Sequence, residues 1–388
     1  MLIRKAYRFR LYPNREQQED LARQFGCARF VYNYFLRQRI DHYTRVGAGL
    51  SYHVTAKMLT DLKYREGFEW LQAANAQALQ QALRDLDSAY RHFFDQRAAF
   101  PRFKSKRDKQ SFRVPQAFRV AGDRLIIPKT APLKMVVHRP VEGTMKQVTV
   151  SKAKSGRYFA SILCDVEVPE PERVRGGQGN VIGIDLGLKD FMVTSDAERA
   201  TTPQYLRKAE KRLKRLQRRV SRRTKGSNRR EKARHALAKQ HEKVANQRSD
   251  FLHKLSRRLV DQNRVIAIES LHVKGMVRNH RLAKSISDAG WGEFLRQLQY
   301  KGAWYGCEVR QVDRFFPSSK RCGACGYIHQ SLTLSQRQWD CPDCGVRHDR
   351  DVNAAKNLLM WSTAGAAGIH ADGEQVRRPR ARHESQAR

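Results

Sequence analysis

Residues 181–187, VIGIDLG, form an apolar, strand-forming run that carries a single acidic residue, Asp185. β-Branched residues and glycine fill the run, which predicts a short buried strand ending at that carboxylate. A turn at Gly187 leads to a second apolar run at 191–196, so the two predict a β-hairpin. Burying a carboxylate is costly unless it is paired. On this stretch alone, Asp185 either accepts backbone N–H groups at the turn or belongs to a cation-binding site.

Two further acids occupy comparable positions. Residues 265–271, VIAIESL, predict a second buried strand that ends at Glu269, and residues 348–360 predict a helix with Asp349 and Asp351 in its entry turn. Either aspartate could cap that helix, so a structural role is the alternative for one of them. An RNase H-like fold brings three carboxylates together in this way: one lies on the first strand, one ends a later strand and one begins the last helix.

The three clustered carboxylates predict a metal site. Like charges a few ångströms apart cannot all stay ionised without cations. We therefore expect Asp185, Glu269 and Asp351 to be catalytic and to hold two Mg²⁺ or Mn²⁺ ions. Hard oxygen ligands without nearby His or Cys favour these ions over zinc. Such an ion pair would activate a water, hold a scissile phosphate and stabilise the leaving oxygen.

A second metal site is predicted by two C-x₂-C pairs, Cys322–Cys325 and Cys341–Cys344, which are separated by 15 residues. This spacing is typical of a Cys₄ zinc ribbon. Four thiolates complete a tetrahedral shell and leave no position for a substrate, so we expect one structural Zn²⁺. A redox-active pair of CxxC motifs is the alternative.

The charge of the chain predicts a polyanionic partner. There are 76 Lys and Arg against 38 Asp and Glu, a formal net charge of +38. Phosphate backbones are the usual partner of such a surface. A membrane surface is the alternative, but no apolar run approaches the roughly 20 residues of a spanning helix. The N-terminus lacks the apolar segment of a signal peptide. We expect a cytoplasmic nucleic-acid-binding protein with no membrane partner.

Two segments concentrate the basic residues. In residues 100–114 Lys and Arg alternate with three phenylalanines, which predicts a groove that follows phosphates and offers rings for stacking; a solvated loop is the alternative. Residues 207–234 hold 15 Lys and Arg against two glutamates, which predicts a helical hairpin lying along nucleic acid. A solvated coiled-coil arm would mix the two signs. Candidate contacts are Arg102, Lys104, Lys106, Arg107, Arg212, Arg215, Arg219 and Arg222.

The order of the segments predicts an α/β multi-domain chain. Residues 3–12 predict a strand, helical periodicity follows, and short apolar segments with turn signals between 118 and 168 predict a small all-β unit. The expected parts are an oligonucleotide-binding β-barrel (1–13 and 99–170), a helical insertion (14–98), a linker (171–180), an RNase H-like domain (181–315 and 349–362), a zinc ribbon within it (316–348) and a basic disordered tail (363–388).

Nine motifs occur in an order that resembles the TnpB family of insertion-sequence-encoded nucleases, which is related to type V CRISPR effectors. They are YRFRLYPN, ARFVYNYFL, FPRFKSKR, GIDLGLKDF, IAIESL, SISDAGWGEF, FFPSSKRCGACG, CPDCG and HDRDVNAAKN. The resemblance covers about residues 3–360, leaving only the tail outside it.

The resemblance implies an RNA-guided DNA endonuclease with a RuvC domain of RNase H-like fold, a wedge-like barrel and a helical recognition insertion. It implies a guide RNA derived from the transposon end, double-stranded target DNA, and a short flanking motif beside the target. The N-terminal half would recognise that motif, with Tyr52 and Gln80 as candidate contacts. Base pairing would recognise the sequence. The three acids and four cysteines of the family are all present. The alternatives are a guide-RNA-dependent DNA-binding regulator that does not cut and a transposase acting on element ends.

Overall fold

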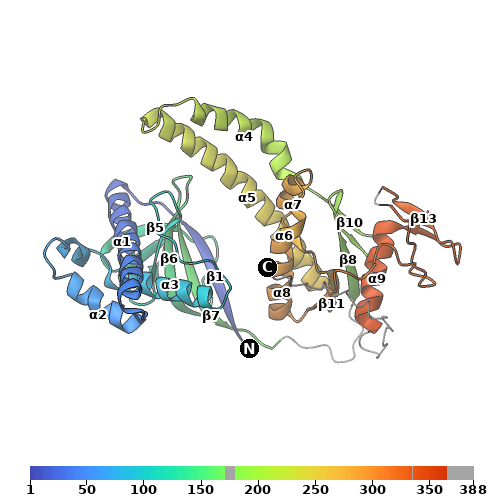
Figure 1. The fold of residues 1–388 in the computed structure, drawn as a ribbon, viewed down its shortest axis with the longest axis horizontal. Helices are drawn as coiled ribbons and strands as arrows, with labels where there is room; N and C mark the ends of the chain where they lie inside the picture. The colour runs from blue at the N-terminus through green and yellow to red at the C-terminus, as the bar shows by residue number, and fades with distance from the viewer. Residues whose placement is uncertain (171–179, 334, 365–388) are drawn as a thin grey trace, which may run out of the picture. The chain divides into compact units, whose positions relative to one another are not determined.

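The computed structural model describes residues 1–170, 180–333 and 335–364, which group into two compact units (Figure 1). Unit 1 contains residues 1–170 and 209–243, and unit 2 contains the other described residues. The expected linker lies outside the described residues except for Asn180, and the expected basic tail lies outside them from residue 365 onward.

Unit 1 contains a seven-stranded sheet with β1 near its centre. The strand order is β2-β6-β7-β1-β5-β4-β3. β1 pairs antiparallel with β7 along ten positions, from Leu2 opposite Glu167 to Leu11 opposite Tyr158. β2 and β3 stand at the two ends of this order, so closure into the expected barrel is not confirmed. The strands are β1 Leu2–Leu11, β2 Gln110–Val114, β3 Arg119–Ala121, β4 Arg124–Ile127, β5 Thr130–Val136, β6 Thr144–Lys152 and β7 Tyr158–Glu167.

Helices fill the chain between β1 and β2. Asn14 followed three residues later by Gln17 predicts a capping box for the first helix, which is confirmed: the Asn14 side chain accepts from the Gln17 N–H at 2.8 Å, and the Gln17 side chain accepts from the Asn14 N–H at 2.9 Å. Arg39 on α1 donates to Asp87 on α3 at 3.1 Å, which ties the two helices together. The helical elements are α1 Arg15–Val46, α2 Tyr52–Leu62, the 3₁₀ turn Glu69–Ala73 and α3 Ala76–Phe94.

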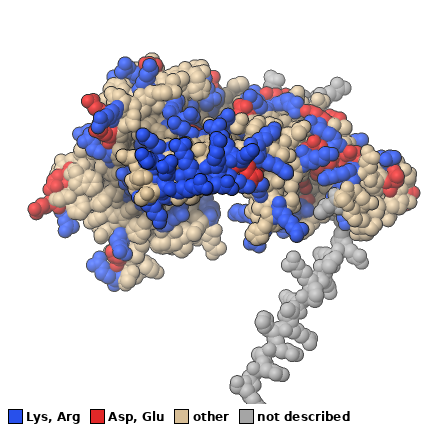
Figure 2. Space-filling model, turned by 90° about the horizontal axis from the view of Figure 1, so that it is seen from above, with Lys and Arg blue, Asp and Glu red and all other residues tan. Residues whose placement is uncertain are grey.

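The basic segment forms the predicted helical hairpin. α4 spans Tyr205–Ser221 and α5 spans Asn228–Gln262, so the turn between them contains Gly226. The apolar positions of residues 250–262 predict a separate helix; this is wrong, because no glycine or proline interrupts residues 228–262 and α5 runs on as one helix. The hairpin lies at the top of Figure 1 and faces the viewer in Figure 2, where Lys and Arg gather in one continuous band.

Unit 2 contains a five-stranded sheet of order β10-β9-β8-β11-β12. The predicted hairpin is confirmed, since β8 pairs antiparallel with β9. β8, β11 and β12 are parallel to one another. The strands are β8 Val181–Leu186, β9 Asp190–Thr194, β10 Arg199–Thr201, β11 Val265–Glu269 and β12 Glu308–Val312.

One face of this sheet supports the hydrophobic core of unit 2. Ile184 and Ile268 are fully buried there against residues of α5, α7 and α8. The apolar spacing in residues 285–306 predicts a single helix, but the segment forms two, because Gly290 adopts a left-handed conformation (φ 75°) that ends one helix and precedes the next. The helices on this side are α6 Val273–Met276, α7 Ala283–Ala289 and α8 Trp291–Tyr305.

The other face of the sheet carries small residues and receives α9, Arg350–Ala364. Figure 1 shows β8 and β11 between α8 on one side and α9 on the other. A Cβ at Gly183 would stand 1.9 Å from the Ala355 carbonyl oxygen, so only glycine permits this approach. Ala267, Ala354 and Ala355 are fully buried at the same layer. The helix that begins at Arg350 is therefore held directly over β8.

The residues between β12 and α9 form a small unit with little core of its own. Two short strands pair antiparallel, β13 Gln338–Asp340 and β14 Arg347–Asp349. Its buried hydrophobic cluster is Cys322, Leu332, Trp339 and Cys341. None of the helices in the described ranges combines the length and the apolar character that crossing a bilayer requires.

Candidate active site and metal centre

The structure brings the three predicted acids together at one edge of the unit 2 sheet. Ile184 on β8 stands opposite Ile268 on β11, so the next residues, Asp185 and Glu269, are neighbours at the carboxyl ends of two parallel strands. Side chains alternate along a strand, so both acids lie on the face that receives α9. Asp351 lies in the first turn of that helix. The negative charges of Asp351 and Glu269 both raise the pKa of Asp185.

The capping role in this turn belongs to Asp349. Its Oδ1 accepts from the Asp351 N–H at 3.1 Å and from the Val352 N–H at 3.0 Å. The sequence left open which aspartate caps the helix and which one faces the other acids. Because Asp349 satisfies the N–H groups at the helix start, the Asp351 carboxylate is available for the acidic cluster.

The electrostatics of the acids indicate a site built for cations. Burial raises the pKa of Asp185 well above its ordinary range, and the charges of Glu269 and Asp351 raise it further. Burial raises the pKa of Glu269 to about 7, although the Leu186 N–H acts in the opposite direction. A divalent cation would favour the ionised forms of all three, and the hard oxygen donor set fits Mg²⁺ or Mn²⁺.

Two arginines that the sequence analysis missed contact the acidic cluster. Arg337, just before β13, donates to both Asp351 oxygens at 3.1 and 3.3 Å. Arg199 on β10 pairs with Asp190 at 3.0 Å and Asp349 at 2.8 Å, and lies 3.9 Å from Asp351. These guanidinium groups balance the carboxylates of the third acid and its neighbours. No local pattern marks either arginine, because their chain positions are remote from the acids they meet.

The four predicted zinc ligands converge. The sulfur atoms of Cys322, Cys325, Cys341 and Cys344 all lie within 4.8 Å of one another. Within the described ranges, no other group of three or more His, Cys, Asp or Glu ligand atoms meets that spacing, so the three acids are neighbours without meeting at one point. A four-sulfur set with these separations fits a tetrahedral metal site and the predicted structural zinc.

The first cysteine of this set is prepared to act as a thiolate. Burial raises the pKa of Cys322, but the N–H groups of Cys325 and Ala324 and the ring of His348 outweigh it and lower the pKa to about 6. The His348 Nε2 lies 3.0 Å from the Cys322 sulfur. Thiolate is the metal-binding form of cysteine.

Two buried asparagines join the cysteine site to the acid-bearing helix. Asn353 donates to the Arg321 carbonyl at 2.7 Å and accepts from the Gly323 N–H at 2.9 Å. Asn357 donates to the carbonyls of Ser318 and Arg321 at 2.8 and 2.7 Å. These bonds hold α9 against the segment that carries the first cysteine pair, Cys322 and Cys325. The position of Asp351 therefore depends on a segment that the four cysteines organise.

Comparison with known proteins agrees with this arrangement. Residues 161–280 match the OrfB_IS605 family, described as "Probable transposase", and residues 291–358 match the Cas12f1-like TNB domain. A Streptomyces pristinaespiralis protein named "Putative RNA-guided DNA endonuclease" is 41% identical over 97% of this chain and 94% of its own length. The Escherichia coli protein InsQ, which carries the same description, is 34% identical over 96% of this chain and 94% of its own length. The chain belongs to the TnpB family.

The fold of this TnpB chain also resembles that of a type V effector. A solved complex titled as Cas12f1 with single-guide RNA and target DNA superposes with a TM-score of 0.57, at 15% identity, over 92% of this chain and 99% of that one. Residues 1–48 also match a family described as a helix-turn-helix domain. In this TnpB chain that segment forms β1 and the single long helix α1, so the described structure has one helix there.

The candidate nucleic-acid contacts of this TnpB chain lie at the surface. Tyr52 begins α2, and its hydroxyl accepts from Arg84 on α3 at 3.3 Å. Gln80 is exposed one turn before Arg84, so these polar groups share one surface of unit 1. The candidate basic residues are exposed as well, namely Arg102, Lys104, Lys106, Arg107, Arg212, Arg215, Arg219 and Arg222.

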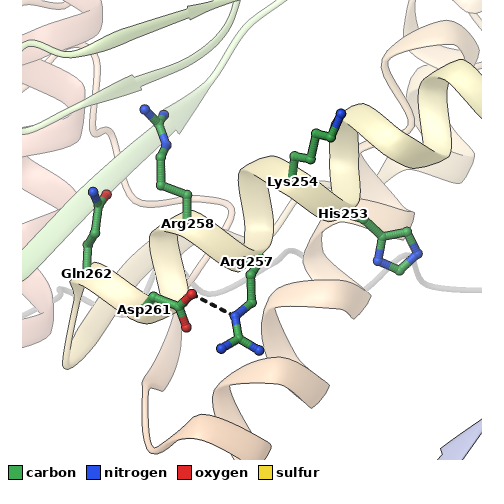
Figure 3. Close-up of a pocket in the computed structure, with 6 residues that line it drawn as sticks. All are labelled: His253, Lys254, Arg257, Arg258, Asp261 and Gln262. Carbon is green, nitrogen blue, oxygen red and sulfur yellow. Dashed lines mark hydrogen bonds and ion pairs between the residues drawn. The ribbon is translucent and has the colours of Figure 1, made fainter. Parts of the chain in front are cut away.

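A hollow on α5 differs from these surfaces in its charge balance (Figure 3). Its six lining residues all come from positions 253–262 of that helix. Lys254 pairs with Asp250 at 2.8 Å, Arg257 with Asp261 at 2.7 Å and Arg258 with Glu198 at 2.6 Å. Each of its lysine and arginine side chains already has a carboxylate partner, which is typical of a solvated helix surface. None of the three acids of the cluster lines it.

The Glu269→Gln variant is expected to be more stable than the unsubstituted protein in buffer without added divalent cations. Between the ordinary pKa of about 4.5 and the folded-state value of about 7, the unfolded chain loses its proton first, so stability falls as pH rises through this interval. Glutamine does not ionise, so the variant does not lose this stability as pH rises. Its advantage in free energy of unfolding should grow by about 1–2 kcal/mol between pH 5.5 and pH 8, measured by chemical denaturation. An advantage of the same size at both pH values would contradict the raised pKa.

Proposed function

We infer that this chain is an RNA-guided DNA endonuclease encoded by a transposable element. The observation that carries the inference is that Asp185, Glu269 and Asp351 are close enough for their charges to act on one another, in a chain whose full-length relatives are named for this activity. The sheet order, with three antiparallel strands followed by two parallel ones, supports an RNase H-like fold for unit 2. We propose that the guide RNA derives from the transposon end and that a short flanking motif licenses cleavage of double-stranded DNA.

The three carboxylates would hold Mg²⁺ or Mn²⁺ ions. When bound, these ions lower the pKa of a coordinated water and neutralise charge on the scissile phosphate. Asp185 and Glu269 hold their positions through the parallel pairing of β8 and β11. Arg337 and Arg199 balance the charge of Asp351 and its neighbours and leave planar N–H donors beside the site, which suit a phosphate. Asp351 is presented by a helix start that Asp349 caps.

The remaining parts of the chain have proposed roles of their own. The unit 1 sheet would be the wedge-like domain, α1–α3 the recognition insertion, and the basic α4–α5 hairpin a track for phosphates. The four cysteines would hold one structural Zn²⁺. Tyr52 and Gln80 are candidates for recognition of the flanking motif. We expect the complex to act in the prokaryotic cytoplasm, on the nucleoid.

The proposal is tested with complex purified from cells that express the chain together with the DNA flanking its gene. The complex is incubated with Mg²⁺ and a plasmid library whose target matches the bound RNA and whose flank is randomised. Cleaved plasmids sharing one flank would support the proposal. Tight binding of matched plasmids without cuts would indicate a regulator, and cutting of element ends that does not depend on RNA would indicate a transposase.

A further inference from the structure

A cavity of about 600 Å³ lies within unit 1, and no residue of the acidic or cysteine cluster lines it. Its walls come from α1, α3, the loop that precedes β2, and the end of β6. This volume is in the range of small-molecule sites and far too small for a nucleic-acid duplex.

The loop that forms one wall is fixed by hydrogen bonds. The Asn33 side chain on α1 donates to the Lys104 carbonyl and accepts from the Lys104 N–H, both at 2.8 Å. The Gln110 side chain donates to the carbonyls of Ser105, Lys106 and Asp108 at 3.0–3.3 Å. These hydrogen bonds fix the main chain around residues 104–110.

Seven lysines and arginines line the cavity against two aspartates, and both aspartates already have partners. Asp85 pairs with Arg113, and Asp108 accepts from the Ser105 N–H at 2.7 Å. This balance is the reverse of that in the α5 hollow, where each lysine or arginine has a carboxylate. The cavity thus carries an excess of positive charge that the neighbouring carboxylates do not neutralise.

Lys104 shows this excess most clearly. Its ammonium lies 3.7 Å from the centre of the Tyr32 ring, and no carboxylate of the described residues approaches it within the 4.0 Å of an ion pair. The Lys104 side chain is exposed along part of its surface, but the groups around its ammonium, including the Tyr32 ring, remove part of its water, and this desolvation lowers the pKa of Lys104. A cation that has lost part of its hydration without gaining a carboxylate is stabilised when an anion binds beside it.

Aromatic rings line the same cavity. Phe25 and Phe112 are buried, with ring centres 5.4 Å apart, and Tyr32 is buried beside them. Phe103, next to Lys104 in the loop, is 49% exposed. Proteins that bind single strands combine basic grooves with aromatic rings on which bases stack, and the exposed Phe103 beside Lys104 offers both features.

We propose that this cavity binds one unstacked nucleotide of a single strand, with its base against Phe103 and its phosphate beside Lys104 and Arg102. The proposal rests on the proposed function, because a guided nuclease exposes single strands of both guide RNA and target DNA. Both sources offer the same chemistry, a base joined to a phosphate. The cavity would fix one defined position of a strand.

The test places a photo-crosslinking phenylalanine analogue, p-benzoylphenylalanine, at Phe103, and at Phe94 as the matched control. Phe94 is 72% exposed on α3 and does not line the cavity. The RNA-bound complex is irradiated with and without matched target DNA. A crosslink from position 103 to one defined RNA nucleotide assigns the site to the guide, and one to a single DNA nucleotide that requires target assigns it to the DNA. Crosslinks no more specific than those from position 94 overturn the proposal.

Affinity for the crosslinked strand gives a second readout. Phe103→Ala is expected to weaken it about 5- to 100-fold, and Phe103→Tyr to preserve it, because tyrosine keeps the stacking surface. Lys104→Gln should reduce the slope of log affinity against log salt by about 0.7, the value for one phosphate of a single strand. The exposed Lys134→Gln on β5, which removes the same charge outside the cavity, should leave the slope unchanged. Unchanged affinity in Phe103→Ala overturns the proposal.

These results separate the two hypotheses. If the unsubstituted complex cuts matched DNA and position 103 gives no specific crosslink, the cavity proposal fails while the nuclease stands. If position 103 crosslinks one nucleotide and the complex does not cut, the cavity binds a strand and the proposed catalytic function fails.

Discussion

Replacing Asp185 with asparagine is expected to lower the rate of DNA cleavage about 10³-fold or more, while binding of guide RNA and target stays close to that of the unsubstituted protein. Asparagine keeps the shape of the side chain and removes the charge. Metal coordination contributes several kcal/mol to a phosphoryl transition state, and each 1.4 kcal/mol is a factor of ten in rate. Binding should persist because the exposed basic surfaces lie on α4, α5 and unit 1.

The measurement compares single-turnover cleavage of matched DNA with binding of the same DNA under identical salt. Asp196→Asn is the matched control, because this aspartate lies in the turn after β9 and contacts Ser195 at 3.3 Å. The control should cut at the rate of the unsubstituted complex. Cleavage that survives in Asp185→Asn at saturating Mg²⁺ would remove Asp185 from the catalytic set and with it the three-acid assignment.

The core of unit 2 could be predicted from its sequence because the pattern of residues along each strand indicates which side chains are buried. The alternation in 181–187 and 265–271 marks apolar positions on one face and Gly183, Ala267 and the two acids on the other. The sequence also places Asp185 and Glu269 at strand ends, which become neighbours when the strands are parallel. Their proximity is thus a consequence of pattern and register, while their catalytic role remains a prediction.

Features that depend on distant contacts could not be predicted in the same way. Asp349 and Asp351 are alike in sequence, and only the hydrogen bonds at the start of α9 distinguish the cap from the acid that joins the cluster. Arg337 lies more than a dozen residues from Asp351 and reaches it because β13 pairs with β14. The interruption at Gly290 was missed because a single glycine inside an apolar periodic pattern is compatible with either a continuous or a broken helix.

Closure of the unit 1 sheet into a barrel could not be predicted from the strand pattern, although the strands themselves could. Alternation predicts each strand and its buried face, and β1 does complete the sheet by pairing with both β7 and β5. Whether the ends of a sheet meet depends on strand tilt and stagger, which alternation does not encode. The sequence therefore favoured a barrel on the number and spacing of short strands, and the structure shows an order with β2 and β3 at its two ends.

The second large effect is expected on removal of zinc. Stripping the metal with a chelator, or substituting Cys325→Ser, should lower the melting temperature of the C-terminal segment and abolish cleavage. Structural zinc contributes about 10 kcal/mol or more to the folding of small domains. The segment between β12 and α9 has only Cys322, Leu332, Trp339 and Cys341 as its buried hydrophobic cluster, so it has little else to hold it together.

Loss of cleavage follows from the hydrogen bonds that leave this segment. Asn353 and Asn357 join α9 to the segment of the first cysteine pair, and Arg337, just before β13, reaches Asp351. Unfolding of the ribbon would leave the two buried asparagine side chains without hydrogen-bond partners and release the helix that carries the third acid.

Metal content by mass spectrometry, melting curves and cleavage are measured on the same samples. The control is Ser331→Ala, which lies in the ribbon outside the cysteine set. An unchanged melting curve in zinc-free protein would contradict a structural metal. Lower stability with full cleavage would show instead that Asp351 keeps its place through the packing of α9 on Gly183 alone.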